Sequence, residues 1–395
     1  MNKLCVKLPP FSPDYSGVCS AIFDLNCIAV IHDASGCTGN YTGYDEPRWY
    51  GSRSAIFCSG LREIDAVLGD DEKMIQKVLR AAESLRPDFI ALIGSPVPMV
   101  IGTDLKGIAA DVELRTKIPC IGFDTTGTGY FPEGLAGACT ALAGRFTRET
   151  GEKKLNGVNL LGVTPLLFGS DTISSLKDVL LQNGFELVAS FCEGLTMQGI
   201  RDAAQASLNL VVSQAGMQPA KYLEQKFGIP YLVGVPLGRR AQADWVKSIF
   251  TCIEEQDSRC PDNCGGDAGI LILGDEVVCK AWQAGLQSEF GAAADCGCLF
   301  GAVSGFFKEN VLELDSEHKI SAAINSGKYY TVIGDPMFRT LIKPDTRLNF
   351  LDYPIYCVSS KMTLQKQANC IGEGLNAYYS HFIEAAKDAA LKKFI

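Results

Sequence analysis

Two cysteines stand beside glycines within the first sixty residues of the chain. Cys37 lies between Gly36 and Gly39, and Cys58 comes two residues before Gly60. Thiolates are the ligands of iron–sulfur clusters, and backbone amides near the cluster tune its sulfurs by hydrogen bonding. Gly36 and Gly39 would let the backbone come close to a bound cofactor. These residues predict a metal-cluster or redox site, with Cys37 and Cys58 as its first candidate ligands.

Two further cysteines in the first 150 residues are candidate ligands. Cys19 is expected near the start of a helix over residues 18–25, where the helix N-terminus would lower the pKa of its thiol. Cys120 is expected in a strand over residues 118–124. The two cysteines beside glycines are only half of the thiolate set of a [4Fe–4S] cluster. We therefore expect a homodimer that brings both pairs to a twofold axis.

Cysteine is frequent in this chain, with sixteen in 395 residues. Disulfides are rare in the cytosol, so free thiols or metal thiolates are expected, and the content also fits an organism that lives without oxygen. The alternative for many of these side chains, Cys19 among them, is a place in the hydrophobic core. Two smaller groups are weaker metal candidates: Cys296 with Cys298, and Cys252 with Cys260 and Cys264.

The composition is that of a globular protein, with 47% hydrophobic and 21% charged residues. A net charge of −9 argues against a basic surface that binds nucleic acid. The first ten residues lack the apolar core of a signal peptide, and no run approaches the ~18 apolar residues of a membrane helix. We therefore expect a cytoplasmic protein that binds neither nucleic acid nor membrane.

Strand and helix signals alternate along the chain, which is too long for a single core. Polar stretches near residues 150–157 and 257–267 predict three domains, at 1–150, 151–260 and 261–395. We predict an α/β fold of three consecutive Rossmann-like domains, each a parallel sheet flanked by helices, with a cleft between them. Since ligands bind at the carboxyl ends of parallel strands, residues that follow the strands should face this cleft.

The candidate cysteines are positioned by four expected strands of the first domain: 28–31, 54–60, 87–95 and 118–124. A loop is expected at 95–98, between the third strand and the next helix. In the third domain we predict strands at 331–333 and 355–358 and a helix over 371–392.

Three common kinds of site are excluded or disfavoured. No G-x-x-x-x-G-K-[ST] motif is present, so ATP binding through a P-loop is excluded. The glycines at 127–134 do not have the spacing of a dinucleotide fingerprint. Three histidines in the whole chain disfavour a zinc hydrolase based on histidine ligands.

The segment His32-Asp-Ala-Ser-Gly-Cys37 resembles the His-Gly-x-x-Gly-Cys segment of nitrogenase component 1 proteins, in which the cysteine binds the P-cluster. Residues 59–69, 184–188 and 208–230 are similar to later segments of the same family. The resemblance covers most of the first two predicted domains and is fainter in the third. It implies that Cys37 is a cluster ligand.

Three serines depart from the pattern of that family. Ser213 stands where the catalytic subunit has the cysteine that anchors the molybdenum cofactor, and Ser95 stands at the third cluster cysteine. Ser12 falls near the first cluster cysteine. A dinitrogen-reducing nitrogenase is therefore not expected, and the resemblance fits nitrogenase-like reductases of tetrapyrroles better. We expect Ser95 and Ser213 to line the cleft, where they would contact a cofactor or substrate, and Thr125 and Thr126 to be available to a substrate there as well.

The resemblance implies an oxidoreductase component with an iron–sulfur cluster, most simply [4Fe–4S]. A separate ATP-dependent iron–sulfur reductase would dock near Cys37 and supply low-potential electrons for a small-molecule or tetrapyrrole-type substrate. Four residues after the cysteine could line the docking or electron-entry surface: Tyr41, Tyr44, Arg48 and Trp49. The expected assembly is a homodimer, or a heteromer with a related subunit. Two alternatives stay open: a scaffold or carrier for metallocofactor assembly, and a ligand-binding α/β protein without a redox role.

Overall fold

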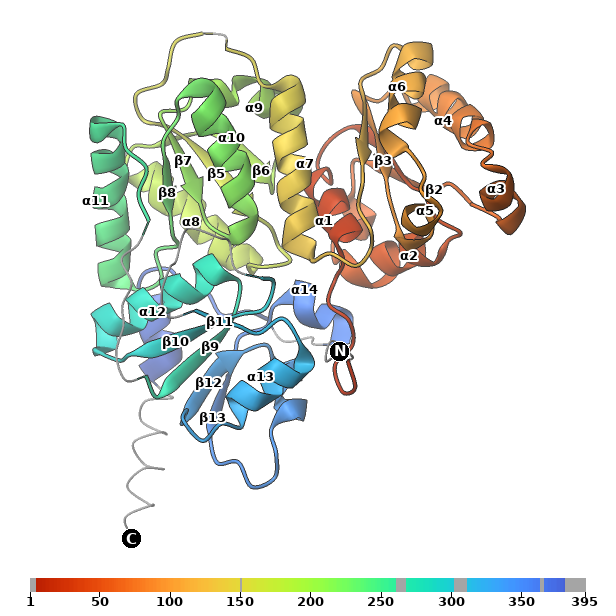
Figure 1. Ribbon diagram of the computed structural model, residues 1–395. Helices are drawn as coiled ribbons and strands as arrows, with labels where there is room; N and C mark the ends of the chain where they lie inside the picture. The colour runs from red at the N-terminus through yellow and green to blue at the C-terminus, as the bar shows by residue number, and fades with distance from the viewer. Residues whose placement is uncertain (1–4, 150, 261–267, 302–310, 363–365, 381–395) are drawn as a thin grey trace.

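The computed structural model describes residues 5–149, 151–260, 268–301, 311–362 and 366–380. These residues form three parallel sheets with helices packed on their faces (Figure 1). The predicted α/β fold with parallel, helix-flanked sheets is therefore confirmed. Within the described residues no helix is both long enough and apolar enough to cross a membrane.

The first sheet has the strand order β2-β1-β3-β4 and carries the candidate cysteines. Its strands are β1 (Cys27–Ile31), β2 (Ala55–Cys58), β3 (Phe89–Ile93) and β4 (Cys120–Phe123). Two helices, α4 (Glu72–Leu85) and α6 (Leu105–Thr116), cover one face of this sheet and bury Ile28 and Val30 of β1 in a small separate core. The other face belongs to the main core, so β1 and β3 are buried along their whole length.

The second and third sheets have the orders β6-β5-β7-β8 and β11-β10-β9-β12-β13. The second sheet comprises β5 (Gly157–Val163), β6 (Glu186–Cys192), β7 (Leu208–Val211) and β8 (Tyr231–Val233), with helices α8 (Ser170–Gln182), α9 (Met197–Asp202), α10 (Met217–Phe227) and α11 (Arg239–Glu255). The third comprises β9 (Ile270–Gly274), β10 (Ala294–Cys298), β11 (Val311–Glu313), β12 (Thr331–Gly334) and β13 (Asn349–Asp352), with helices α12 (Glu276–Phe290), α13 (Glu317–Ile324) and α14 (Tyr356–Ser359).

Two helices join the first sheet to the second. Figure 1 shows α7 (Phe131–Phe146) between these sheets, and α1 (Asp14–Ala21) packs against it. Their backbones meet at two glycines: a Cβ on Gly134 would lie 1.8 Å from the Asp14 carbonyl oxygen, and one on Gly17 would lie 2.1 Å from that of Phe131. One hydrophobic core therefore extends through all three sheets.

Because α1 and α7 approach so closely, adding a single methyl group at their contact should strongly destabilise the fold. We expect Gly134→Ala to lower the free energy of unfolding by about 3 kcal/mol, because the helices must separate to admit the Cβ. Gly137→Ala on the same helix is the matched control: no atom lies within 4 Å of its Cβ position. That variant should gain about 0.5–1 kcal/mol from helix propensity. Urea denaturation measures both, and equal effects of the two substitutions would contradict the packing argument.

Three local predictions differ from the structure. Residues 355–358 are not a strand: α14 covers Tyr356–Ser359, because the Asp335 carboxylate accepts hydrogen bonds from the Ile355 amide and the Ser359 hydroxyl at 2.8 Å each. The expected loop at 95–98 belongs mostly to α5 (Pro96–Ile101), whose first position suits proline. Of the helix predicted over 371–392, residues 374–380 are helical and residues 381–392 lie outside the described part of the chain.

Candidate functional site

Cys37 lies just beyond the carboxyl end of β1. The glycine-containing segment around it is a short helix, α2 (Gly36–Asn40), followed by a π-helical turn. The Asp33 carboxylate organises its start, since Oδ2 accepts hydrogen bonds from the amides of Ser35 at 2.9 Å and Cys37 at 2.8 Å. These amides are therefore already engaged within the chain.

The glycines of this segment face open space. No atom of the described structure lies within 4 Å of a Cβ position on Gly36 or Gly39. Neither glycine is thus required by packing inside this chain. Because they have no side chains, another molecule can come close to the backbone beside Cys37.

The Cys37 thiol is half-buried between two hydroxyl groups. The hydroxyl groups of Tyr15 and Ser95 lie beside its sulfur, and Ser95 donates its proton to the His32 carbonyl at 2.8 Å. Burial, and secondly the charge of Asp33, raise the pKa of the Cys37 thiol above its usual value, while the two hydroxyls act in the opposite direction. The cysteine is a protonated thiol at neutral pH, and a metal ion would have to displace that proton.

Cys58 lies at the same edge of the sheet as Cys37. It is the last residue of β2, paired with Ile31 of β1. Its thiol donates to the Asp33 carbonyl at 3.2 Å and accepts from the Gly60 amide at 3.3 Å. Asp33 therefore contacts both candidate ligands, through its carboxylate at Cys37 and through its carbonyl at Cys58.

The structure places Cys19 away from this edge and away from any helix start. α1 begins at Asp14, so Cys19 is its sixth residue rather than the first residue of a helix over 18–25. Its side chain is fully buried in the main core. Burial raises the pKa of the Cys19 thiol well above its usual value, which is the opposite of the expected helix effect.

Cys120 lies at the opposite edge of the first sheet. It is the first residue of β4 and pairs with Ile90 near the start of β3, whereas Cys58 pairs with the end of β1. Burial raises the pKa of its thiol to about 12. Of the four candidate ligands the structure thus brings only Cys37 and Cys58 together. Among the described residues no group of three or more His, Cys, Asp and Glu side chains could hold a metal ion.

The weaker cysteine groups are placed as follows. Cys296 and Cys298 are fully buried within β10, and Cys252 is fully buried in α11. Cys260 is partly buried at the end of a described range, and Cys264 lies outside the described residues. These thiols are mostly core side chains.

Ser95 and Ser213 both follow strands, but their surroundings differ. Ser95 is fully buried beside Cys37. Ser213 follows β7 of the second sheet, and its hydroxyl donates to the Gly162 carbonyl at 2.6 Å. Because Ser213 is fully buried and its one hydroxyl proton is engaged, a substrate could reach it only if this packing opened.

The residue after Ser213 ties the second sheet to the third. The Gln214 amide donates to both carboxylate oxygens of Asp275, at 3.1 and 3.0 Å. Asp275 also caps α12 by accepting from the Val277 amide at 3.0 Å. Burial raises the pKa of Asp275 to about 7. A contact between sheets therefore depends on a carboxyl group that titrates near neutral pH.

This raised pKa predicts a pH-dependent stability. Between its ordinary pKa of 3.8 and about 7, Asp275 binds a proton in the folded chain but not in the unfolded chain, so the free energy of unfolding falls as pH rises through this range. Asp275→Asn imitates the protonated form, and we expect it to reduce the fall between pH 5 and pH 8 by roughly 1–3 kcal/mol. Urea denaturation at both pH values tests this; an unchanged fall would contradict it. Asp45→Asn, at a second buried carboxyl group with pKa about 6, is the comparison.

The segment after Cys37 is packed more tightly than a docking loop. Tyr41 is fully buried and lies edge-on to Trp49, with ring centres 6.4 Å apart. Arg48 binds the fully buried carboxylate of Glu46 and reaches Glu193, the residue after β6 of the second sheet, at 2.7 Å. Two aromatic side chains of this segment are exposed to solvent: Tyr44 at 60% and Tyr50 at 100%.

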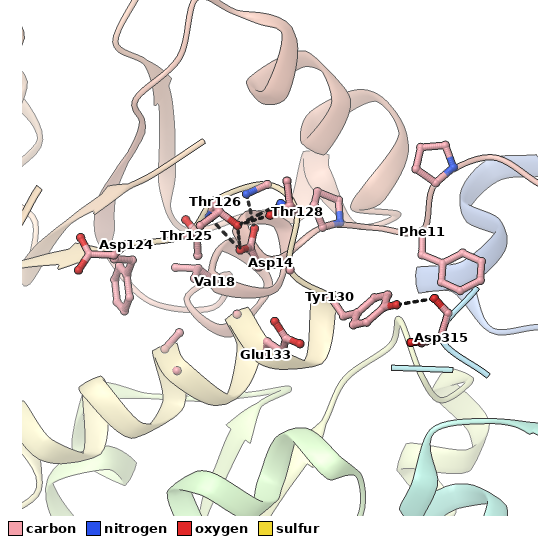
Figure 2. Close-up of a pocket in the computed structure, with 18 of the residues that line it drawn as sticks. Phe11, Asp14, Val18, Asp124, Thr125, Thr126, Thr128, Tyr130, Glu133 and Asp315 are labelled. Atoms are coloured by element: carbon pink, nitrogen blue, oxygen red, sulfur yellow. Dashed lines mark hydrogen bonds between the residues drawn. The ribbon is translucent and has the colours of Figure 1, made fainter. Parts of the chain in front are cut away.

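A cavity of about 930 Å³ lies between the residues that follow β4 and the start of α13, close to the carboxyl end of β4 (Figure 2). Thr125 and Thr126 line it, as expected for residues after a strand. Asp14 holds this loop by accepting from the amides of Thr126 at 2.9 Å and Gly127 at 2.8 Å. Across the cavity the Tyr130 hydroxyl donates to the Asp315 carbonyl at 3.1 Å.

The lining of this cavity is acidic. Glu133 and Asp14 face each other beside Gly129, and burial followed by the charge of Asp14 raises the pKa of Glu133. Lys106 also lines the cavity, and its ammonium group is paired with Asp124 at 2.5 Å. An acidic lining disfavours anions and admits neutral or cationic polar molecules. Neither Asp14 nor Glu133 was expected from the sequence; the signal for Asp14 is the Pro-Asp pair at 13–14, which marks a helix start.

Comparison with known proteins identifies relatives for this fold and site. The profile described as nitrogenase component 1 type oxidoreductase matches residues 17–262. The nitrogenase iron-molybdenum cofactor biosynthesis protein NifE of Clostridium pasteurianum is 29% identical over 224 residues, 54% of this chain and 48% of that protein. A light-independent protochlorophyllide reductase subunit of Gloeothece citriformis is 25% identical over 201 residues, 48% of this chain and 39% of that protein. The chain thus spans about half or less of the length of these two relatives.

A solved structure described as nitrogenase Cp1 at pH 6.5 has the same fold. It superposes with a TM-score of 0.69 over 89% of this chain and 86% of its own, at 15% sequence identity. At that identity the likeness concerns the fold alone. The family profile, by contrast, covers more than half of the chain, including the Cys37 segment, the first sheet and the second sheet. The protein therefore belongs to the family of nitrogenase component 1 type oxidoreductases.

Proposed function

We propose that the protein is an iron–sulfur component of a nitrogenase-like oxidoreductase, with Cys37 and Cys58 as cluster ligands. The observation that carries the proposal is the convergence of these two cysteines around Asp33 at the carboxyl edge of the first sheet. Both thiols are partly exposed, whereas Cys19 and Cys120 are buried elsewhere. Two thiols do not complete a [4Fe–4S] site, so the donor set of a single chain does not fit that cluster, while the set of two chains does.

The surface around the two cysteines supports a shared site. The helices that follow β2 and β3, α3 (Glu63–Leu68) and α5, expose large apolar side chains at this edge. Val67, Leu68 and Val100 are 75%, 70% and 76% exposed. Clustered exposed apolar residues mark protein interfaces. We propose that a second copy of this chain covers them, which would bury the cysteines of both subunits together; a related subunit in its place is the alternative outcome.

The residues around the sulfurs suit thiolate ligands. When Cys37 loses its proton to metal, the Tyr15 hydroxyl can donate to the sulfur, because it accepts from the Asn40 side-chain amide at 3.4 Å and keeps its own proton for the thiolate. The Gly60 amide already donates to the Cys58 sulfur. A bound cluster supplies one-electron chemistry, and these donors stabilise the thiolates that hold it.

We propose that a separate ATP-dependent iron–sulfur reductase supplies low-potential electrons at this edge, in the cytoplasm. The likeness to the protochlorophyllide reductase subunit and the family profile support this role. The acidic cavity lined by Thr125 and Thr126 is the proposed place for a small-molecule or tetrapyrrole-type substrate. Its acidic lining favours a substrate whose buried part is neutral or cationic.

The proposal is tested by the iron content and mass of protein prepared without oxygen. We expect a dimer with about two irons and two sulfides per chain, the value for one [4Fe–4S] cluster shared by two chains, and an EPR signal after reduction. Colourless, iron-free protein would overturn the proposal and favour a ligand-binding protein without a redox role. About four irons per monomeric chain would refute the sharing.

A scaffold for metallocofactor assembly is the second candidate, favoured by the likeness to NifE, whose description names cofactor biosynthesis. The two candidates differ in what happens to the iron. A scaffold gives up its metal cluster to an acceptor protein and shows no turnover with a reductase. An oxidoreductase component keeps its cluster through repeated turnover.

A further inference from the structure

Two buried thiols face each other at a junction between α7 and the second sheet. Cys139 lies on α7, and Cys192 is the last residue of β6. Their sulfur atoms are 3.5 Å apart, and the two residues are 1% and 0% exposed. Neither takes part in the proposed cluster site. The pair joins two elements that are 53 residues apart in the sequence.

The backbone at Cys192 is held in an unusual conformation. Its φ of +96° lies in the region that favours glycine. Arg86, Lys117 and Gln256 also have positive φ, but each of them ends a helix at φ between 48° and 60°, an ordinary left-handed position. A cysteine in this conformation at the end of a strand carries backbone strain.

We propose that Cys139 and Cys192 form a reversible disulfide when the protein meets hydrogen peroxide. One sulfur, as a thiolate, attacks a peroxide oxygen; the O–O bond breaks, and the released hydroxide takes up a proton to become water. The second sulfur attacks the resulting sulfenic acid, the S–S bond forms, and water leaves. Two thiols thus lose two electrons and two protons, and one peroxide is reduced to two waters.

The geometry allows this bond and gives it a consequence. The sulfurs must approach from 3.5 Å to about 2.05 Å, a closure of about 1.5 Å that the two side chains and the backbone at Cys192 would share. The residue after Cys192 is Glu193, whose carboxylate binds Arg48 at 2.7 Å. Arg48 in turn holds Glu46 in the segment that follows Cys37. Oxidation would therefore alter the contact between the second domain and this segment, whether or not a cluster is bound.

Burial determines how fast the bond forms. Peroxide reaches the pair only when the structure opens locally, so exposed thiols react first. Burial, followed by the hydrogen bond with Cys139, also raises the pKa of the Cys192 thiol well above its usual value. We therefore expect oxidation to be slower than that of the exposed Cys5 and to accelerate in mild urea.

The test treats the full chain with hydrogen peroxide, blocks the remaining thiols with iodoacetamide in denaturant, and maps the peptides by mass spectrometry. We expect a cross-linked peptide pair containing residues 139 and 192, about 2 Da lighter than the two thiol peptides together, and its loss on treatment with dithiothreitol. Cys27 is the matched control, because it is equally buried but its sulfur contacts the Ser54 hydroxyl instead of a thiol. It should stay alkylated as a thiol.

A substitution separates this bond from general oxidation. Cys192→Gly suits the positive φ and removes the sulfur, so it should fold and leave Cys139 as an alkylated thiol after peroxide. The proposal is overturned if both cysteines of the wild-type chain remain thiols after prolonged peroxide treatment in mild urea, where local opening admits the peroxide, or if Cys139 links to another cysteine. The wild-type peptide map decides the matter even if the variant does not fold.

Discussion

Cys37→Ala is expected to strip the protein of its iron. The substitution removes one thiolate from each chain, and therefore two of the four proposed ligands of a shared cluster. Loss of a supporting outer-shell partner alone lowers metal affinity by about 10–100-fold, so loss of a ligand should lower the iron content of anaerobically prepared protein by at least about tenfold. Iron and sulfide analysis, with the visible absorption of the cluster, measures the effect.

Cys120→Ala is the matched control for this prediction. Its thiol belongs to the same sheet but lies at the amino end of β4, so its removal should leave iron unchanged. The variant leaves a small cavity in the core beside α4 and α6. Equal loss of iron in the two variants would point to a general effect on folding. Full retention of iron in Cys37→Ala would refute the assignment of Cys37 as a ligand.

The first-domain strands and the place of Cys37 follow from the sequence because they depend on local patterns. Short apolar runs such as those within 28–31 and 87–95 are typical of buried central strands, and the residue types after them are polar or glycine. The edge that carries Cys37 and Cys58 is therefore predictable, since parallel strands all end at one edge. The structure places both cysteines there.

The two misplaced cysteines show what local patterns miss. The apolar run after Val18 suggested a helix start near Cys19, but Pro13 and Asp14 already begin that helix. Cys120 was associated with a strand without regard to which end of the strand it occupies. The residue that follows β4 at the functional edge is Asp124, which lines the cavity.

The cavity itself could not be predicted from local patterns. It is formed where the start of α7 meets the residues before α13 of the third domain, segments that are about half the chain apart. Its acidic character depends on which side chains this docking turns inward. The same holds for Ser213, whose hydroxyl is engaged because Gly162, at φ +80°, brings the carbonyl of β5 within 2.6 Å.

The second large effect concerns Arg48, which links the Cys37 segment to the end of β6 in the second sheet. Its guanidinium binds both oxygens of Glu46, at 2.9 and 3.1 Å, and Glu193 at 2.7 Å, and it stacks 3.9 Å above the Phe23 ring. The Glu46 side chain is completely shielded from solvent. Arg48→Ala leaves that carboxylate without its cation, and we expect a loss of about 3–5 kcal/mol in the free energy of unfolding.

A second substitution identifies the cause of that loss. In the double variant Arg48→Ala with Glu46→Gln, the buried group is neutral, so part of the stability should return, by about 1–3 kcal/mol in urea denaturation. A double variant no more stable than Arg48→Ala would mean that packing on Phe23, and not the unpaired charge, dominates. If the double variant does regain stability, the ion pairs of Arg48 hold the segment from Cys37 to Trp49 against Glu193, the residue after Cys192.

Oxidation of Cys192 would then affect the segment after Cys37 through Glu193 and Arg48. The Arg48→Ala variant should therefore also lose any effect of peroxide on this segment.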